Sequence, residues 1–252
     1  MLSFRVKSLM NNLIFLDFDG VLFNTAKEAY AVSMIAVNTF MDIDNVKFDS
    51  KYYHDFIKYR YLVGPAWNYK YILEILDSDG VLNFEHKYKT LIQNAKKEDY
   101  QKFENSFFEA RRSLKEDNFS QWLQLNEPND FLTLVKPFLV SNRDFFRIIT
   151  TKDKATVTKL LDINNVLFCT KLIYDREDFE KYENKANIIK SILSLNNVEK
   201  AIFIDDSEQH LSGCRNIKNL ELCQPNWGYV SKDDKGVQSK EVILEKVRKL
   251  LR

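Results

Sequence analysis

Two carboxylates lie two residues apart directly after a short apolar run near the start of the chain. The run is Leu13–Leu16, and Asp17 and Asp19 follow it, with Gly20 next. An apolar run that stops at Asp and Gly is typical of a strand buried on both faces of a parallel sheet. Side chains two residues apart on an extended chain point to the same side. The spacing therefore predicts two carboxylates at the carboxyl end of a buried strand, where open α/β sheets bind ligands.

A second pair of carboxylates, Asp205 and Asp206, follows another apolar run at 201–204. Four carboxylates at one edge of a sheet repel each other strongly unless a cation lies between them. Oxygen ligands of this kind suit Mg²⁺, which typically takes few protein carboxylates together with a substrate phosphate. Asp is also a common helix cap. Two such pairs after two apolar strands nevertheless favour a Mg²⁺ site.

Two more residues suit an anionic ligand. Thr150 ends a third apolar run at 145–149, where its hydroxyl and a neighbouring backbone N–H could hold a phosphate oxygen, although Thr also caps helices. Lys185 opens a helical pattern and precedes Asp205 by 20 residues. A lysine at such a position is more often a solvated surface charge.

The elements that must position these residues alternate between strand and helix. Apolar runs typical of buried strands occur near 13–17, 146–150, 166–169 and 201–205. Helical patterns cover Lys154–Leu161, with Asp153 as its N-cap, and Lys185–Leu195. This alternation predicts an α/β fold with a doubly wound parallel sheet.

Residues 25–139 have a different pattern. Apolar and aromatic residues recur there at spacings of three and four, which is typical of amphipathic helices. We expect helices at about 29–40, 69–76, 84–95 and 98–114, and another whose first turn contains Pro128 and which runs to about Lys136. The sequence therefore predicts a sheet domain formed by 1–24 and 140–252, with an all-helical domain of 25–139 inserted after the first strand.

Composition excludes several classes of protein. There are 37 Lys+Arg against 36 Asp+Glu, a net charge of +1, which removes any general argument for binding nucleic acid or an anionic membrane. The apolar runs are too short to cross a bilayer, and the N-terminus does not have the pattern of a signal peptide. The three cysteines form no CxxC pair. We therefore expect a reduced, cytoplasmic protein.

In their order along the chain, four segments resemble the motifs of the haloacid dehalogenase-like hydrolase superfamily. The segments are Asp17–Val21, Ile148–Lys152, Lys185 and Ile202–Ser207. The resemblance implies a Rossmann-like core and Mg²⁺-dependent phosphoryl transfer through an aspartyl-phosphate. It also implies that the helical insert is a mobile type 1 cap, although 115 residues, counted from 25 through 139, is large for one.

The resemblance also implies roles for single residues. Asp17 matches the nucleophile, Asp19 the general acid/base, and Thr150 and Lys185 the catalytic groups that hold the phosphoryl oxygens. Asp17, the main-chain carbonyl of Asp19, and the fourth motif would bind Mg²⁺. Within that motif Asp206 matches the metal-binding position better than Asp205. Gly20, Thr151 and Arg60 are the candidate substrate contacts.

The chain departs from the family pattern at two places. His210 stands where many members have a further acidic residue, which leaves Asp205 or Glu208 as a substitute ligand. With no second His or Cys nearby, we expect His210 itself to be an exposed or hydrogen-bonded helix residue. Lys185 is not followed by the usual Pro, so Lys171 competes for its role, and we prefer Lys185 for its spacing before Asp205.

The expected activity is hydrolysis of a small phosphorylated metabolite. Asp19 distinguishes the chain from dehalogenases and phosphonate hydrolases, which the resemblance implies usually lack it. A phosphomutase keeps both aspartates and stays an alternative, as does a non-catalytic binding module that retains the fold. Within the predicted cap, the Gly–Pro turn of Tyr59–Trp67 is the best candidate for a substrate loop. The oligomeric state is left open.

Overall fold

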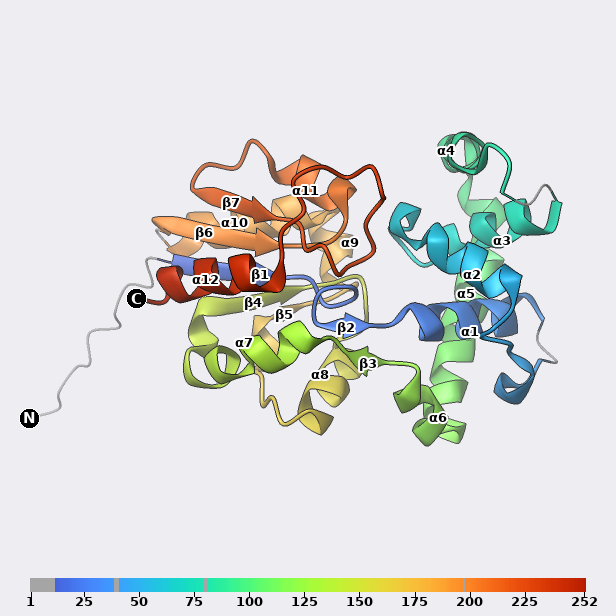
Figure 1. Cartoon of the computed structure of the whole chain (residues 1–252), viewed down its shortest axis with the longest axis horizontal. Coiled ribbons are helices and arrows are strands. Elements are labelled where there is room, and N and C mark those ends of the chain that lie inside the picture. Colours follow the sequence, from blue (N-terminus) through green and yellow to red (C-terminus); the bar gives the residue numbers. More distant parts are fainter. Residues whose placement is uncertain (1–11, 39–40, 79–80, 197) are drawn as a thin grey trace, which may run out of the picture. The chain divides into compact units, whose positions relative to one another are not determined.

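The computed structural model describes residues 12–38, 41–78, 81–196 and 198–252, and the chain divides into two compact units (Figure 1). One, here called the sheet unit, contains the chain up to Phe23 and again from Pro128 to Arg252; the other, the helical unit, is Asn24–Glu127. Residues 1–11, where we found no signal-peptide pattern, lie outside the described residues, as do positions 39 and 40 of the first expected helix.

The sheet unit is built on five parallel strands in the order β5-β4-β1-β6-β7. Because the chain adds strands first on one side of β1 and then on the other, the sheet is doubly wound, as predicted. In register, Phe15 of β1 lies between Arg147 and Phe203 of its neighbours. The strands are β1 (Asn12–Leu16), β4 (Phe146–Ile149), β5 (Ile173–Tyr174), β6 (Lys200–Ile204) and β7 (Leu220–Cys223).

Helices cover both faces of this sheet (Figure 1). They are α7 (Asp130–Ser141), α8 (Lys154–Ile163), α9 (Asp178–Tyr182), α10 (Lys185–Asn196), α11 (Glu208–Cys214) and α12 (Lys240–Leu250). Alternate strand residues such as Leu13, Phe15 and Phe203 form one buried core with Ile188 and Ile192 of α10. On the other face α12 packs against β1, β6 and α7. Burial on both faces explains why the strands are continuously apolar.

The strand predicted at 166–169 is wrong. Leu167 is 76% exposed, and a 3₁₀ helix, Thr170–Leu172, follows. The strand of this part of the sheet is β5, Ile173–Tyr174, two residues long at the edge. An apolar run by itself does not separate a buried strand from a loop with alternating exposure, and a two-residue strand is too short to produce a periodic pattern.

The second predicted domain boundary is also wrong. The change between units falls at Glu127–Pro128, and α7 belongs to the sheet unit. Phe131 packs on Trp227 with ring centroids 4.9 Å apart, and Asp130 pairs with Lys240 at 2.6 Å. An amphipathic helix has the same sequence pattern whether it covers a sheet or another helix, so composition alone assigned it to the insert.

The helical unit consists of short and long helices around an aromatic core. These are α1 (Ala26–Val37), α2 (Lys51–Lys58), α3 (Asn68–Ser78), α4 (Phe84–Asn94), α5 (Lys97–Asp117) and α6 (Phe119–Gln124). The Tyr69 ring stacks on those of Phe56 and Phe107, at centroid distances of 5.4 and 5.6 Å. Glu28 and Arg111 form a buried bidentate ion pair between α1 and α5.

Both connections between the units pass through short strands, β2 (Phe23–Asn24) and β3 (Glu127–Pro128), which form a two-stranded sheet. Pro128 therefore lies in a strand and not in the first turn of a helix. Among the helices that the structure describes, none has the length and apolar character needed to span a membrane.

Candidate active site

A buried lysine joins the ends of β1 and β6. Lys185, the first residue of α10, places its Nζ atom 2.9 Å from Oδ2 of Asp17 and 2.7 Å from Oδ2 of Asp205. All three side chains are less than a tenth exposed. His210 of α11 contacts Asp205 from its Nδ1 atom at 3.2 Å. The four residues form one continuous network at the carboxyl edge of the sheet, at the point where the winding reverses.

The network holds its carboxylates in unequal electrostatic environments. Burial would raise the pKa of Asp205, but Lys185 and His210 outweigh it and lower the value to about 2. Burial, together with the charge of Asp205, raises the pKa of Asp17 to about 6 even beside Lys185. Burial also opposes the charge on Lys185, yet its two carboxylate partners raise the pKa of this lysine above its ordinary value. Lys185 therefore stays an ammonium at neutral pH, and Asp205 is the more firmly ionised of its two carboxylate partners.

Asp206 faces the loop that follows β1. A Cβ atom on Gly20 would lie 2.0 Å from Oδ2 of Asp206, so this carboxylate rests against the backbone of the loop. Gly20 has φ of +80°, a conformation that glycine adopts without strain. The backbone N–H of Tyr229 donates to the same Oδ2 atom at 2.6 Å.

Asp19 has a lysine partner of its own. The Nζ atom of Lys152 lies 3.3 Å from Oδ1 of Asp19, and the Lys152 side chain is only 2% exposed. The backbone N–H of Lys152 donates to the hydroxyl of Thr150, and that of Thr150 to the carbonyl of Tyr174. The Thr150 hydroxyl thus accepts from the backbone N–H of Lys152, while Asp153 and not Thr150 caps α8.

Comparison with solved structures shows which proteins this chain resembles in fold. A structure described as a predicted phosphatase from Clostridium acetobutylicum is 17% identical, with a TM-score of 0.60 over 95% of this chain and 99% of that one. A predicted phosphoglycolate phosphatase from Haemophilus somnus is 12% identical, with a TM-score of 0.52 over 88% of each chain. Protein Tyrosine Kinase A (PtkA) from Mycobacterium tuberculosis is 15% identical, with a TM-score of 0.50 over 94% and 97%. Searches of protein-family models and of curated proteins found no match.

These matches extend over 88–95% of this chain. The chain has a haloacid dehalogenase-like fold. The fold predicted from the four motifs is thereby confirmed. At sequence identities of 12–17%, these matches establish a similar fold but not a similar reaction. The names of the matching structures include both a phosphatase and a kinase.

Within this haloacid dehalogenase-like fold, the alternatives that the sequence left open separate by position. Lys185 is buried against Asp17, whereas Lys171 is exposed in a 3₁₀ helix. Glu208 is exposed and pairs with Arg215 on its own helix. His210 is hydrogen-bonded to Asp205, which is the structural role expected for it. Thr151 is half-buried next to Thr150.

Arg60 lies in the helical unit. It donates to the carbonyl of Val63 at 3.2 Å, and its guanidinium lies 5.2 Å from the centroid of the Tyr69 ring. Within the same segment, the Trp67 ring stacks on Tyr100 at 4.1 Å. These contacts fold the Tyr59–Trp67 segment against its own unit, and a substrate contact from Arg60 stays a prediction.

The residues at the sheet edge fit a divalent cation. Potential ligand atoms of Asp17, Asp205 and His210 lie within 4.8 Å of one another, although the Lys185 ammonium already contacts both of these carboxylates. The Asp206 carboxylate, which lies against the backbone at Gly20, offers oxygen atoms, the ligands that Mg²⁺ prefers. Burial is the main cause of the raised pKa of Asp17, and a cation bound beside it would favour the charged carboxylate.

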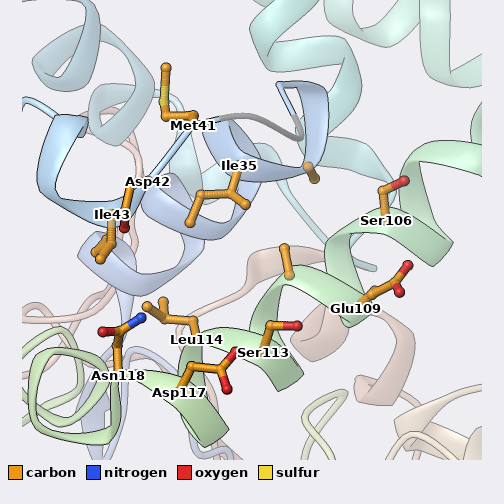
Figure 2. A pocket seen from close by; sticks show the side chains of 12 residues that line it. Ile35, Met41, Asp42, Ile43, Ser106, Glu109, Ser113, Leu114, Asp117 and Asn118 are labelled. Carbon is orange, nitrogen blue, oxygen red and sulfur yellow. The ribbon is translucent and has the colours of Figure 1, made fainter.

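A separate cavity of about 410 Å³ lies in the helical unit, between the end of α1 and the face of α5 (Figure 2). It is lined by apolar side chains, among them Ile35 and Leu114, and by the carboxylates of Asp42, Glu109 and Asp117. No lysine or arginine lines it among the described residues. It is therefore unsuited to a phosphate group and contains none of the predicted site residues.

Sequence reasoning missed two parts of the site. Lys152 is part of the second motif, but the sequence analysis assigned it no function. Its contact with Asp19 is visible only in the structure. The Trp227–Tyr229 segment was not singled out at all, although its Tyr229 N–H binds Asp206. The signal available was a Trp-Gly-Tyr triplet in a chain with only six glycines.

Proposed function

We propose that this chain is a Mg²⁺-dependent phosphatase that hydrolyses a small phosphomonoester through an aspartyl-phosphate on Asp17. The observation that carries the proposal is the contact between Asp17 and the buried Lys185 ammonium at 2.9 Å. The contact holds one carboxylate oxygen in place and puts a fixed positive charge where a transferred phosphoryl group would carry negative charge. Phosphoryl transfer depends mainly on such alignment and neutralisation.

The proposed reaction has two steps. An oxygen of Asp17 attacks phosphorus, the bond between phosphorus and the substrate oxygen breaks, and Asp19 gives its proton to the leaving alkoxide. A water molecule then attacks the phosphorus of the aspartyl-phosphate and loses a proton to Asp19. This second step releases inorganic phosphate and restores both carboxyl groups. Lys152, 3.3 Å from Asp19, fixes the direction of the carboxyl that moves these protons.

Asp17, Asp206 and the main-chain carbonyl of Asp19 would hold the Mg²⁺ ion. The ion, when bound, supplies positive charge against the phosphoryl oxygens. Asp205 has a different part in the proposal: its ion pair with Lys185 and contact with His210 keep the lysine in place beside Asp17.

Two observations support a small substrate. Two of the matching structures are described as phosphatases, one of them as a phosphoglycolate phosphatase. In addition, the helical unit is inserted directly after the loop that carries Asp17 and Asp19, as expected for a cap that encloses a small molecule during the reaction. We propose that Gly20, Thr151 and Arg60 contact this substrate and that the protein acts in the cytoplasm.

A panel of phosphorylated metabolites, assayed for released phosphate with Mg²⁺ and with excess chelator, tests the proposal. We expect release from at least one phosphomonoester with Mg²⁺ only. Isomerisation of a phosphosugar without release of phosphate would instead identify a phosphomutase. Binding without turnover across the panel would identify a non-catalytic module.

A further inference from the structure

The loop between β7 and α12 lies against Asp206. A Cβ atom placed on Gly228 of this loop would lie 2.3 Å from Cβ of Asp206 and 3.0 Å from its Cγ. Since real Cβ atoms do not approach other atoms this closely, any larger residue at 228 must displace either the loop or the aspartate. Gly228 has no positive φ, so the restriction comes from the proximity of Asp206 and not from the backbone conformation.

The same loop binds Asp206 at both its side chain and its backbone. The Tyr229 N–H donates to Oδ2 of Asp206 at 2.6 Å, and the Gln224 side-chain amide donates to its carbonyl at 3.0 Å. Gln224 in turn donates to Asp234 at 2.9 Å, and the Ser231 N–H donates to the same Asp234 oxygen at 3.1 Å. The loop is therefore cross-linked within itself by the same residues that bind Asp206.

Trp227 connects this loop to the other half of the site. Its indole N–H donates to the carbonyl of Val21 at 3.1 Å, in the loop that carries Asp17 and Asp19. Its ring packs on Phe131 of α7, and the Lys240 ammonium lies 5.9 Å from its centroid. Residues 227–229 thus contact the strand-end loop of β1 and the strand-end aspartate of β6 together.

We infer that Trp227–Tyr229 is a positioning segment that sets the Asp206 carboxylate at the distance from the β1 loop that Mg²⁺ binding requires. The inference rests on the proposed function. In this role none of the three side chains needs to touch the ion. A carboxylate that binds a metal is held in its orientation by residues that hydrogen-bond to it. Loss of such a hydrogen-bonding residue typically lowers metal affinity by about 10- to 100-fold.

Gly228→Ala tests the inference, with Gly213→Ala as its matched control because a Cβ on Gly213 of α11 meets nothing within 4 Å. Titration calorimetry of MgCl₂ into each metal-free protein measures binding without activity. We expect Gly228→Ala to bind Mg²⁺ at least about tenfold more weakly and Gly213→Ala to bind like the wild type. Excess Mg²⁺ should restore the turnover of Gly228→Ala, which a merely misfolded variant would not show.

Equal Mg²⁺ affinity of Gly228→Ala and the wild type would overturn the inference and leave the proposed function intact. A wild type that binds no Mg²⁺ would overturn both. If Gly228→Ala does not fold, Trp227→Phe decides, because it keeps an aromatic ring at the position and removes the hydrogen bond to Val21. We expect it to bind Mg²⁺ several-fold more weakly, on the order of one lost hydrogen bond, and unchanged affinity would contradict the inference.

Discussion

Lys185 is the residue on which the proposed chemistry depends most. An ammonium group taken out of water needs compensating charge, and here Asp17 and Asp205 supply it from two different strands. Removal of the lysine would leave two buried carboxylates close together without their shared partner. Its effect on the reaction should therefore far exceed that of any exposed lysine.

We predict that Lys185→Met lowers the turnover of a phosphomonoester by at least about 100-fold, in line with the loss of one preorganised charge at a reacting group. Lys171→Met is the control, since Lys171 is exposed and was the sequence-based competitor for the role. Steady-state kinetics of both variants, with circular dichroism to verify folding, make the comparison. Similar losses in the two variants would refute the assignment of Lys185.

The cysteines offer a pH-dependent prediction. Burial raises the pKa of both Cys214 and Cys223 to about 11, whereas Cys169 is exposed. A thiol with this pKa is about one-thousandth thiolate at pH 8, and only the thiolate reacts. We expect one thiol per chain to react rapidly with a disulfide reagent at pH 8. The other two should react faster as the pH rises toward 11, or at once in denaturant. Rapid reaction of all three at pH 8 would contradict the burial of Cys214 and Cys223.

At the residue scale, the sequence located the strand-end aspartates, because an apolar run that stops at Asp has a direct physical meaning. It did not reveal which lysine meets which aspartate. Lys152 and Asp19 are 133 positions apart in the sequence, and Trp227 and Val21 are 206 positions apart. Contacts across such separations follow from the packing of the sheet and leave no local pattern.

At the scale of elements, long periodic segments were predictable and short or shared ones were not. The helix expected at 98–114 is α5, Lys97–Asp117, and that at 84–95 is α4, Phe84–Asn94. The two-residue strand β5 and the side of the boundary on which α7 falls were missed, because each is decided by tertiary contacts. Those contacts also include the buried Glu28–Arg111 pair between α1 and α5, which no helical pattern indicates.

We predict that Glu28→Ala destabilises the helical unit by about 3–5 kcal/mol, since it leaves the buried Arg111 guanidinium without its bidentate partner. Replacement of both residues by leucine should recover much of the loss. Lys51→Ala is the control: it breaks an exposed pair with Asp55 and should cost at most about 0.5 kcal/mol. Hydrogen exchange of the slowest α1 and α5 amides measures all three. A loss below about 1 kcal/mol for Glu28→Ala would show that the pair contributes little.

At the scale of the whole molecule, the residues proposed for the chemistry and the residue proposed for substrate recognition belong to different units. The sheet unit contains Asp17, Asp19, Thr150, Lys185 and the fourth-motif aspartates, and the helical unit contains Arg60. From the sequence we expected the helical insert to span 25–139, which would put its connections to the sheet domain near residues 24–25 and 139–140. The units are joined instead at Phe23–Asn24 and Glu127–Pro128. A helical unit that closes as a rigid body would need backbone changes only at these two points.

We predict that Arg60→Ala raises the KM for the best metabolite of the panel more than it affects hydrolysis of p-nitrophenyl phosphate. The reason is that a residue of the helical unit would contact the distinctive part of the substrate and not the reacting phosphoryl group. Lys58→Ala, an exposed position on α2, is the control. An equal loss on both substrates would place Arg60 in the structure of its own unit, where it already binds Val63.

The central claim is that the Asp17 carboxylate is the nucleophile of a Mg²⁺-dependent hydrolysis, and turnover by Asp17→Asn beside the wild type tests it most directly. The amide keeps the shape of the side chain and removes the charge and nucleophilicity of the carboxylate. The account predicts wild-type turnover that requires Mg²⁺ and stops with excess chelator, and a loss of several orders of magnitude in Asp17→Asn at any Mg²⁺ concentration. Full turnover by Asp17→Asn, or wild-type turnover that a chelator leaves unchanged, would contradict it.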